Sequence, residues 1–271
     1  MGEIDILEFL SEYKNSTKEI IYIPNPGNAG DALIAHGTLK VFDKIGLSYT
    51  FGTGKYPNRK RYNQKILIYA GGGSLNDLYP GVRSKEFILN NCNRRGNEIV
   101  VLPHTIKEVD SLLSQLGNNV KIICRERISY DYVRGTIKNV DNVFLSDDMA
   151  MHIDGLGEYT KRTGVGVCNC FRTDVTERTD IDIPMDNVDL SFELEDEKNT
   201  GNPEVIKRVS LSVFDYLSKY ETINTNRLHM GIAGSLLGRQ VNMHPNSYYK
   251  NFAIYEYSLK GRYPNTMWMG V

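Results

Sequence analysis

Ile223-Asn224-Thr225-Asn226-Arg227-Leu228-His229-Met230-Gly231 has the pattern of a strand that passes into a helix. A β-branched, apolar start is followed by Thr225 and Asn226, which are both good helix N-caps. An apolar run rich in small residues then continues until Gly238. The stretch therefore predicts a strand, a cap and a helix, which is the repeating unit of α/β folds.

Arg227 and His229 fall on the first turn of this predicted helix. The N–H groups of a first turn have no partner inside the helix and the dipole is positive there, so the position favours an anion. A permanent guanidinium and a titratable imidazole make an anion site that can also move a proton. An isolated Arg-x-His more often marks an ion-paired arginine and a packed histidine, but the strand–helix junction favours function. We take His229 and Arg227 as catalytic candidates and Asn226 as a binding candidate.

The composition is that of a soluble globular protein. The chain has 271 residues, 41% of them hydrophobic and 24% charged, with a net charge of −1. This length allows two domains of about 100–150 residues each. The near-zero net charge argues against a nucleic-acid binder. No window approaches the roughly 18 continuous apolar residues of a membrane span, and the acidic start lacks the basic residues of a secretory signal. The four cysteines predict reduced structural thiols in a cytosolic protein.

Strand-like and helix-like stretches alternate along the whole chain, which predicts mostly parallel sheets covered on both faces. A change of rhythm over residues 151–161 places the domain boundary, giving an N-terminal Rossmann-like domain over residues 1–155 and a smaller one over residues 156–271. The expected strands are residues 18–25, 65–70, 98–102, 120–124, 143–146, 164–170 and 188–194. The expected helices are residues 31–45, residues 203–220 and a Tyr-rich tail, residues 247–260, that docks across domains. We expect residues 171–187 to form an irregular loop near the cleft.

The first of three turns at strand ends, where open α/β sheets bind ligands, covers residues 25–31. Its glycines permit close backbone approach, and Asp31 is expected to cap the helix or to reach a hydroxyl. The turn has neither a dinucleotide fingerprint nor a P-loop lysine, so neither site is supported. Taken alone, such a turn is most often structural. Its binding candidates are Asn28, Gly30 and Asp31.

The second turn is the glycine run that begins at Gly71 and includes the binding candidates Gly72, Gly73 and Ser74. Three glycines at a strand end cost backbone entropy, so we expect something to approach that backbone closely. Backbone amides and the serine hydroxyl can hold a phosphate or a sugar. The alternative is a flexible connector.

The third turn places Arg125 at a strand end, pointing into the cleft, before a helix capped by Ser129. Glu126 and Arg127 are expected to pair with each other on the surface. His104 also follows a predicted strand, so we take Arg125 and His104 as binding candidates. The five histidines show no metal-ligand spacing, and no metal site is predicted.

In this order the motifs resemble the polysaccharide pyruvyl transferase family. The matching elements are Asn28-x-Gly30-Asp31, Gly71-Gly72-Gly73-Ser74, Arg125-Glu126-x-x-Ser129, Asp147-Asp148-Met149-Ala150 and Thr225-Asn226-Arg227-Leu228-His229. Asp148-Met149 replaces the frequent Asp-Pro of the family, which affects only a linker turn, and the second domain is short. The resemblance implies a fold similar to GT-B glycosyltransferases, with two Rossmann-like domains facing a cleft. It also implies that phosphoenolpyruvate gives its pyruvyl group to two hydroxyls of one sugar, forming a cyclic ketal, with Arg125, Arg227 and His229 as the key basic residues.

The residues are chemically compatible with this reaction. Phosphoenolpyruvate carries a carboxylate and a phosphate, and two arginines can bind both in a fixed orientation. His229 is the candidate general acid, or the group that activates the sugar hydroxyl and protonates the phosphate. No metal or cofactor is required if the arginines and the helix N-terminus carry the charge.

Two other functions remain open from the sequence. A GT-B glycosyltransferase would need a nucleotide-sugar site, usually with an acidic residue on the ribose, and no acidic residue follows Arg227 until Glu256. A non-catalytic phosphate- or glycan-binding module would use the same glycine turns. For a pyruvyl transferase we expect a cytosolic enzyme, because phosphoenolpyruvate is a cytosolic metabolite. Its acceptor would be a saccharide, free or lipid-linked at the inner membrane face, for a capsule or other surface polymer.

Overall fold

The computed structural model describes residues 2–25, 27–52, 61–78, 84–94, 96–174, 181–194 and 201–270. Its contacts divide the chain into two compact units. Unit 1 comprises Met1–Asn25 and Thr38–Met149, and unit 2 comprises Pro26–Gly37 and Ala150–Val271. Each unit has a parallel sheet with helices, which confirms the α/β class. The domain boundary at 155/156 and the GT-B-like arrangement stay predictions.

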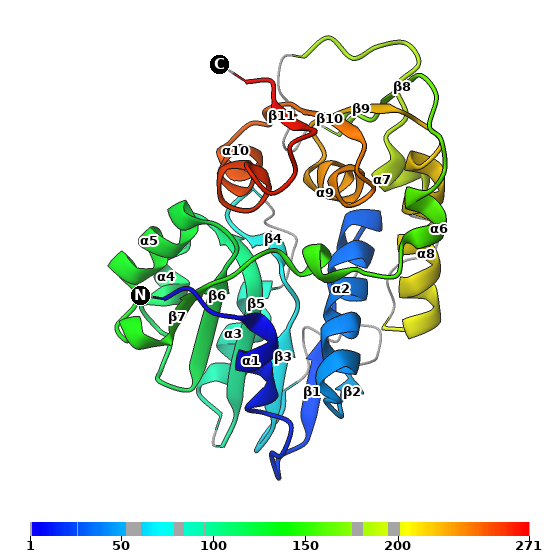
Figure 1. The fold of residues 1–271 in the computed structure, drawn as a ribbon. Helices are drawn as coiled ribbons and strands as arrows, with labels where there is room; N and C mark the ends of the chain where they lie inside the picture. Colours follow the sequence, from blue (N-terminus) through cyan, green and yellow to red (C-terminus); the bar gives the residue numbers. More distant parts are fainter. Residues whose placement is uncertain are drawn as a thin grey trace. The chain divides into compact units, whose positions relative to one another are not determined.

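Unit 1 is built on one parallel sheet (Figure 1). The strand order is β2-β1-β3-β5-β6-β7, with β4 paired to β5. Every residue of β1 and β3 is buried, as expected for strands covered on both faces. The strands are β1 (Ile20–Ile23), β2 (Thr50–Phe51), β3 (Ile66–Tyr69), β4 (Gly72–Leu75), β5 (Glu98–Ile106), β6 (Val120–Cys124) and β7 (Val143–Leu145); the helices are α1 (Ile6–Ser11), α3 (Ser84–Cys92), α4 (Asp110–Leu113), α5 (Arg127–Thr136) and a 3-10 turn, η2 (Val140–Asn142).

Unit 2 has a smaller parallel sheet in the order β11-β10-β9-β8. Its longest helix, α8, begins with the Asn202 side chain capping the Glu204 N–H and with Pro203 in the first turn, where no donor is needed. The strands are β8 (Val167–Asn169), β9 (Thr222–Thr225), β10 (Gln240–Met243) and β11 (Thr266–Trp268); the helices are α6 (Gly157–Thr160), α7 (Leu190–Glu193), α8 (Pro203–Leu217), α9 (Leu228–Leu236) and α10 (Lys250–Ile254), followed by a π-helical turn, η4 (Tyr255–Leu259).

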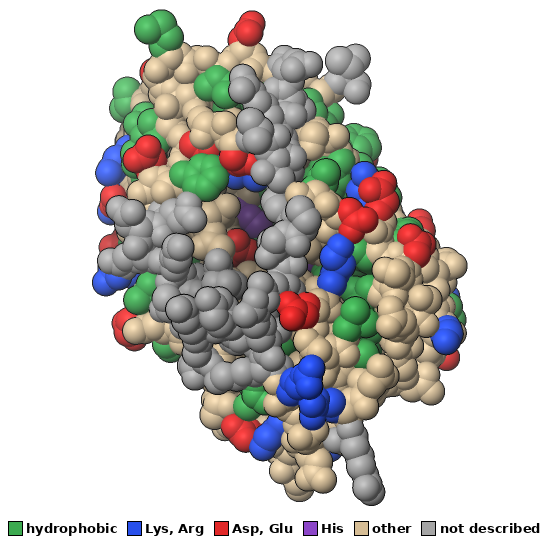
Figure 2. Space-filling view, turned by 180° about the vertical axis from the view of Figure 1, so that it is seen from behind, with side chains coloured by type: hydrophobic (Ala, Val, Ile, Leu, Met, Phe, Trp, Pro, Cys, Tyr) green, Lys and Arg blue, Asp and Glu red, His purple; other side chains and the backbone are tan. Residues whose placement is uncertain are grey.

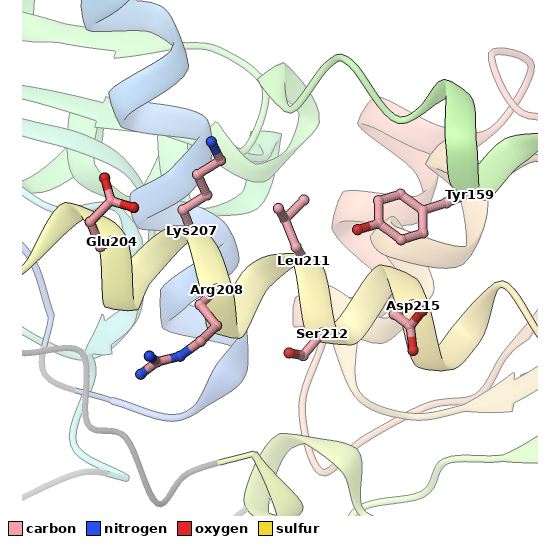
Figure 3. Close-up of a pocket in the computed structure, with 7 residues that line it drawn as sticks. All are labelled: Tyr159, Glu204, Lys207, Arg208, Leu211, Ser212 and Asp215. Atoms are coloured by element: carbon pink, nitrogen blue, oxygen red, sulfur yellow. The ribbon is translucent and has the colours of Figure 1, made fainter.

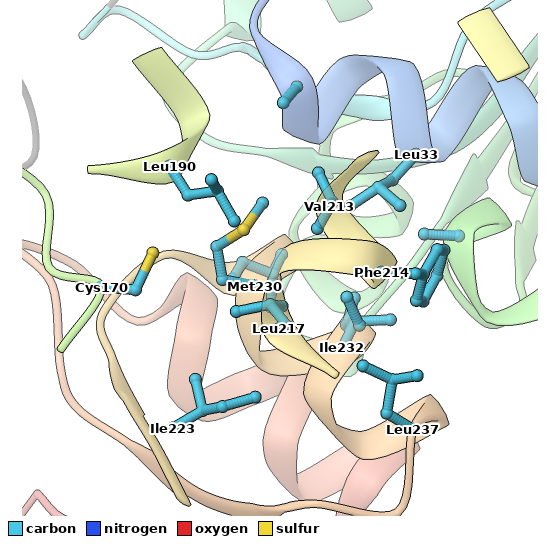
Figure 4. Close-up of a cluster of buried hydrophobic side chains, with 14 of the residues drawn as sticks. Leu33, Cys170, Leu190, Val213, Phe214, Leu217, Ile223, Met230, Ile232 and Leu237 are labelled. Atoms are coloured by element: carbon cyan, nitrogen blue, oxygen red, sulfur yellow. The ribbon is translucent and has the colours of Figure 1, made fainter. Parts of the chain in front are cut away.

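The long helix α2 (Ala29–Ile45) contributes its first turns to unit 2 and the rest to unit 1. Leu33 of α2 lies among the buried side chains of α8 and α9, with Val213 and Ile232 nearby (Figure 4). His36, the next turn along, is buried and its Nδ1 lies 2.8 Å from the Ser210 Oγ. The start of α2 is therefore part of the core of unit 2, and His36 is packed there instead of lying in a polar site.

Helix α9 lies unusually close to the sheet below it. A methyl group on Gly234 would stand 2.8 Å from side-chain carbons of both Ile223 and Val241. A methyl group on Gly231 would stand 3.1 Å from the Met243 sulfur. Close packing thus explains the small residues of the predicted helix. They set the distance between α9 and the sheet of unit 2.

Two predicted elements are wrong. The stretch expected as a strand over residues 188–194 bends after one backbone bond from Val188 to the Asn169 carbonyl and becomes the short helix α7. The glycine run expected as a turn is the strand β4, because the neighbouring strand β5 continues through Pro103 to Ile106 and gives it a partner. His104 consequently lies inside a strand instead of following one.

The described parts of the remaining segments agree with the secondary structure expected from the sequence. Residues 250–259 of the predicted tail helix are helical, while its docking across domains stays a prediction. Residues 171–174 and 181–187 of the predicted loop form neither helix nor strand, and its residues 175–180 lie outside the described residues. All four cysteines are buried and free, and burial raises the pKa of Cys168 to about 11. In the described part of the chain, no helix is both long and apolar enough to cross a membrane.

Candidate functional site

The start of α9 is built by the residues of the opening motif. The Thr225 hydroxyl accepts the Arg227 N–H at 2.9 Å and donates to the Cys170 carbonyl at 2.6 Å. Arg227 itself occupies the N-cap position, with extended backbone angles of −83° and 111°. Thr225 and Asn226, expected as caps, therefore precede the cap and shape the turn that leads into it. The Asn226 Oδ1 accepts the Arg172 N–H at 2.8 Å, so this side chain holds the segment after β8.

His229 is the second residue of α9 and lies against the first turn of α2. A methyl group on Gly30 would stand 2.6 Å from the His229 Nδ1, so only glycine leaves room for the ring. Asn28 caps α2, because its Oδ1 accepts the Gly30 N–H at 2.9 Å. The cap expected of Asp31 is therefore supplied by Asn28. The positive ends of two helices meet at this imidazole.

Arg227 is almost completely buried and ion-paired. Its Nε and Nη2 bind the two carboxylate oxygens of Asp189 at 2.9 and 2.5 Å. Its Nη2 also binds the Asp174 Oδ2 at 2.8 Å, and its guanidinium lies 4.9 Å from the centre of the Phe192 ring. The buried carboxylate of Asp189, the partly buried carboxylate of Asp174 and an aromatic face fix the guanidinium beside the α9 N-terminus.

Three charged residues of this cluster were not predicted: Arg172, Asp174 and Asp189. Arg172 and Asp174 follow β8 directly, and Asp189 precedes α7. A basic and an acidic residue two positions apart after a predicted strand end is the one sequence pattern that could have identified them. Asp189 was placed in a strand, which hid its role.

Arg125 occupies a different environment, inside unit 1. Its Nη1 binds the Asp148 Oδ2 at 2.6 Å and its Nε binds the Thr105 Oγ1 at 2.9 Å. Both ionic side chains are at most 1% exposed. A fully buried pair of this kind has a fixed geometry. Its role as a substrate-binding residue stays a prediction.

The helix after Arg125 is capped by Glu126, whose carboxylate accepts the Ser129 N–H at 2.9 Å. The expected cap, Ser129, instead binds the Ile106 backbone through its hydroxyl. Burial raises the pKa of Glu126 above its usual range. The expected surface pair with Arg127 is also wrong, because Glu126 is buried and Arg127 reaches Glu3 at 3.7 Å.

His104 and Ser74 belong to a buried polar chain in unit 1. The Ser74 N–H donates to the His104 Nε2 at 3.1 Å, so the proton of the neutral imidazole is on Nδ1. The Ser74 hydroxyl lies 2.7 Å from the Ser84 hydroxyl, which in turn lies 2.6 Å from the Tyr69 hydroxyl. Burial, with Arg125 as the second cause, lowers the pKa of His104 to about 3. This imidazole is uncharged at neutral pH.

The predicted site residues thus fall into two sets. Unit 1 holds Gly72, Gly73, Ser74, His104 and Arg125; unit 2 holds Asn28, Gly30, Asp31, Asn226, Arg227 and His229. Within unit 2 the structure brings Asn28 and Gly30 to His229, although they are about 200 residues apart in the sequence. Among the described residues, no group of three or more His, Cys, Asp or Glu side chains is placed to hold a metal ion.

A surface hollow of about 430 Å³ lies elsewhere in unit 2, on the outer face of α8 (Figure 3). Six of its lining side chains come from α8, and Tyr159 comes from α6. Asp215 of α8 binds Arg162 at 2.6 Å. The lining residues are Tyr159, Glu204, Lys207, Arg208, Leu211, Ser212 and Asp215. Acidic and basic side chains are interspersed on the face shown in Figure 2. The lining of the hollow is mixed in the same way, with Glu204 and Asp215 beside Lys207 and Arg208, which is the usual character of a solvated surface. The chemistry therefore points to the start of α9 and not to this hollow.

Comparison with known proteins decides the family. The family model described as polysaccharide pyruvyl transferase matches residues 28–243, from the cap of α2 to the end of β10. The chain belongs to the polysaccharide pyruvyl transferase family. It is 27% identical over 285 aligned positions to EpsO of Bacillus subtilis (strain 168), which is named as a pyruvyl transferase; the match covers 90% of this chain and 86% of EpsO. It also resembles the crystal structure of the functionally uncharacterised protein KP1_0663 of Klebsiella pneumoniae subsp. pneumoniae NTUH-K2044, with 33% identity, a TM-score of 0.81 and coverage of 98% and 97% of the two chains. As a family member, the chain is a transferase that acts in polysaccharide biosynthesis.

Proposed function

We propose that this transferase moves the pyruvyl group of phosphoenolpyruvate onto two hydroxyls of one saccharide, forming a cyclic ketal and releasing phosphate. The observation that carries the proposal is the meeting of the α2 and α9 first turns at His229, next to the buried guanidinium of Arg227. The two helix N-termini supply positive potential for a small donor with two anionic groups, and the guanidinium supplies oriented hydrogen-bond donors. The imidazole supplies a side chain that can act as a general acid or a general base.

The reaction needs one proton delivered to carbon and two hydroxyls that each give up a proton. The methylene carbon of phosphoenolpyruvate takes a proton and becomes a methyl group, while the first sugar hydroxyl adds to the neighbouring carbon and gives up its own proton. The second hydroxyl then replaces phosphate at the same carbon, and its proton leaves with the phosphate. We assign to His229 the transfer of these protons and to Arg227 the orientation of the donor anion.

The ion pairs of Arg227 support a positioning role. Asp189 accepts two parallel hydrogen bonds from the guanidinium, and these bonds fix the plane of the guanidinium. Because the N–H groups of the guanidinium are already oriented, less entropy is lost when the substrate binds. We place the reaction in the cytoplasm because phosphoenolpyruvate is a cytosolic metabolite, and a lipid-linked saccharide at the inner membrane face belongs in the set of acceptors to be tested.

Phosphate release from phosphoenolpyruvate, measured with galactose-, mannose- and glucosamine-type acceptors, tests this proposal. We expect acceptor-dependent release and a product heavier by one ketal-linked pyruvyl group. His229→Gln should lower kcat by about 10²- to 10⁴-fold, and Arg227→Lys should lower kcat/KM by about 100-fold, since lysine cannot reproduce the bidentate geometry.

Arg127→Lys is the matched control, because this arginine is 66% exposed and should tolerate the change. Thermal unfolding of each variant separates lost chemistry from lost folding. Turnover of a nucleotide sugar without consumption of phosphoenolpyruvate would overturn the proposal in favour of a glycosyltransferase.

A further inference from the structure

Among the residues that the structure describes, four charged side chains form one cluster beside the start of α9. The Asp174 Oδ2 accepts a hydrogen bond from the Arg172 Nε at 2.7 Å and another from the Arg227 Nη2 at 2.8 Å. Arg227 is also held by Asp189. One carboxylate oxygen therefore lies between two guanidinium groups that come from different segments of unit 2.

The two acids of this cluster differ in how they are held. The Asp189 side chain is 5% exposed, and its Oδ2 also accepts the N–H and the hydroxyl of Thr173 at 2.8 and 3.0 Å. The Asp174 side chain is 19% exposed, and its oxygen bridges Arg172 and Arg227, whose own side chains are 9% and 5% exposed. Asp189 is thus anchored to the backbone, whereas Asp174 reaches the guanidinium groups from the more exposed side.

Two guanidinium groups that converge on one anionic oxygen are the geometry with which proteins bind carboxylates and phosphates. With both acids in place, the two arginines are neutralised. Without the Asp174 carboxylate, the cluster carries one net positive charge in a nearly buried position, where an anion interacts more strongly than in water. A small anion could replace the Asp174 oxygen and satisfy the same donors.

We propose that Arg172 and Arg227 form an oxyanion subsite for the donor, and that Asp174 is a resident anion which the carboxylate or phosphate of the donor displaces. The identity of this ligand rests on the proposed function; the subsite itself rests on the hydrogen bonds of the cluster. Asp189 is a positioning residue that keeps Arg227 in place when Asp174 leaves. Arg172 becomes a second substrate-binding arginine of unit 2.

Calorimetric titration of phosphoenolpyruvate, inorganic phosphate and pyruvate into the full chain tests the subsite without requiring turnover. Asp174→Asn should bind phosphoenolpyruvate about tenfold more tightly than the wild type, because the competing charge is gone. Asp189→Asn should bind it about tenfold more weakly, because Arg227 loses its orientation. A general electrostatic effect of removing a negative charge would instead tighten binding in both variants. If the affinity for inorganic phosphate also rises in Asp174→Asn, the phosphate end of the donor enters the subsite. If the affinity for pyruvate rises instead, the carboxylate end enters it.

Arg172→Lys keeps the charge and loses the planar fork, so it should weaken binding of phosphoenolpyruvate about tenfold even if Asp174→Asn does not fold. Unchanged or weaker binding by a folded Asp174→Asn, or unchanged binding by Arg172→Lys, would overturn the subsite. If binding follows the expected pattern but no ketal forms with any acceptor, the subsite stands and the proposed function fails. If the ketal forms but the acid variants behave alike, the subsite alone fails.

Discussion

The absent side chain of Gly30 is what allows the His229 imidazole to lie against α2. A methyl group there would stand 2.6 Å from the His229 Nδ1 and 3.0 Å from the Asn28 Oδ1, and both distances are too short. Gly30→Ala should therefore turn the ring and disturb the cap of α2. Because a displacement of about 1 Å can cost 10²-fold in rate, we expect phosphate release to fall by roughly 10- to 100-fold.

Gly157→Ala is the matched control at this scale, since nothing lies within 4 Å of the added methyl group. Turnover should be unchanged in that variant. Wild-type turnover by a folded Gly30→Ala protein would contradict the role given to the contact. The sequence placed Gly30 and His229 in one candidate set through a family resemblance, but only the fold shows that the glycine makes room for the imidazole.

At the scale of elements, Arg239 joins the C-terminal ends of two helices. Its Nη2 donates to the Arg162 and Ser218 carbonyls at 2.7 Å each and lies 3.4 Å from the Tyr159 carbonyl. These carbonyls belong to the ends of α6 and α8, where a cation is favourable. Hydrogen bonds from a charged donor contribute about 1.5–3 kcal/mol, so Arg239→Met should lower the thermal midpoint by roughly 5–10 °C.

Arg127→Met provides the comparison, because its ion pair with Glu3 is exposed and long, at 3.7 Å. Such surface pairs contribute about 0–1 kcal/mol. Equal midpoints for the two variants in differential scanning calorimetry would show that Arg239 does not stabilise the ends of α6 and α8.

The elements that sequence predicted correctly are those whose pattern is local. The buried strand β3 is a continuous apolar run and the helix α8 has amphipathic periodicity, so tertiary contacts were not needed to recognise either. β4 could not be predicted, because a glycine run becomes a strand only when β5 extends far enough to pair with it. α7 was missed for a similar reason: Asp189 accepts hydrogen bonds from Thr173 and Arg227, and the chain there does not pair with a sheet. Arg172 and Asp174 are near neighbours in the sequence, but their meeting with Arg227 depends on segments more than 50 residues apart.

At the scale of the whole molecule, buried polar groups make stability depend on pH. His104 is fully buried beside Arg125, and burial is the larger cause of its low pKa, about 3 against a usual 6.5. Because this pKa is lower in the folded protein than in the unfolded chain, unfolding takes up a proton below pH 6.5, and acid favours the unfolded chain. The stability contribution is fully present above pH 6.5 and is lost progressively as the pH falls towards 3.

His104→Gln tests this dependence, because glutamine retains an oxygen that can accept the Ser74 N–H but has no proton to gain. At about 1.4 kcal/mol per pK unit, the wild type should lose roughly 2 kcal/mol more than the variant between pH 7.5 and pH 5. Urea unfolding at a series of pH values measures the difference directly. His244, whose pKa burial also lowers, and Glu126, whose raised pKa acts in the opposite direction, are common to both proteins and cancel. Parallel pH profiles for the two proteins would mean that His104 is not the acid-sensitive group of the fold, and that the loss of stability in acid arises elsewhere.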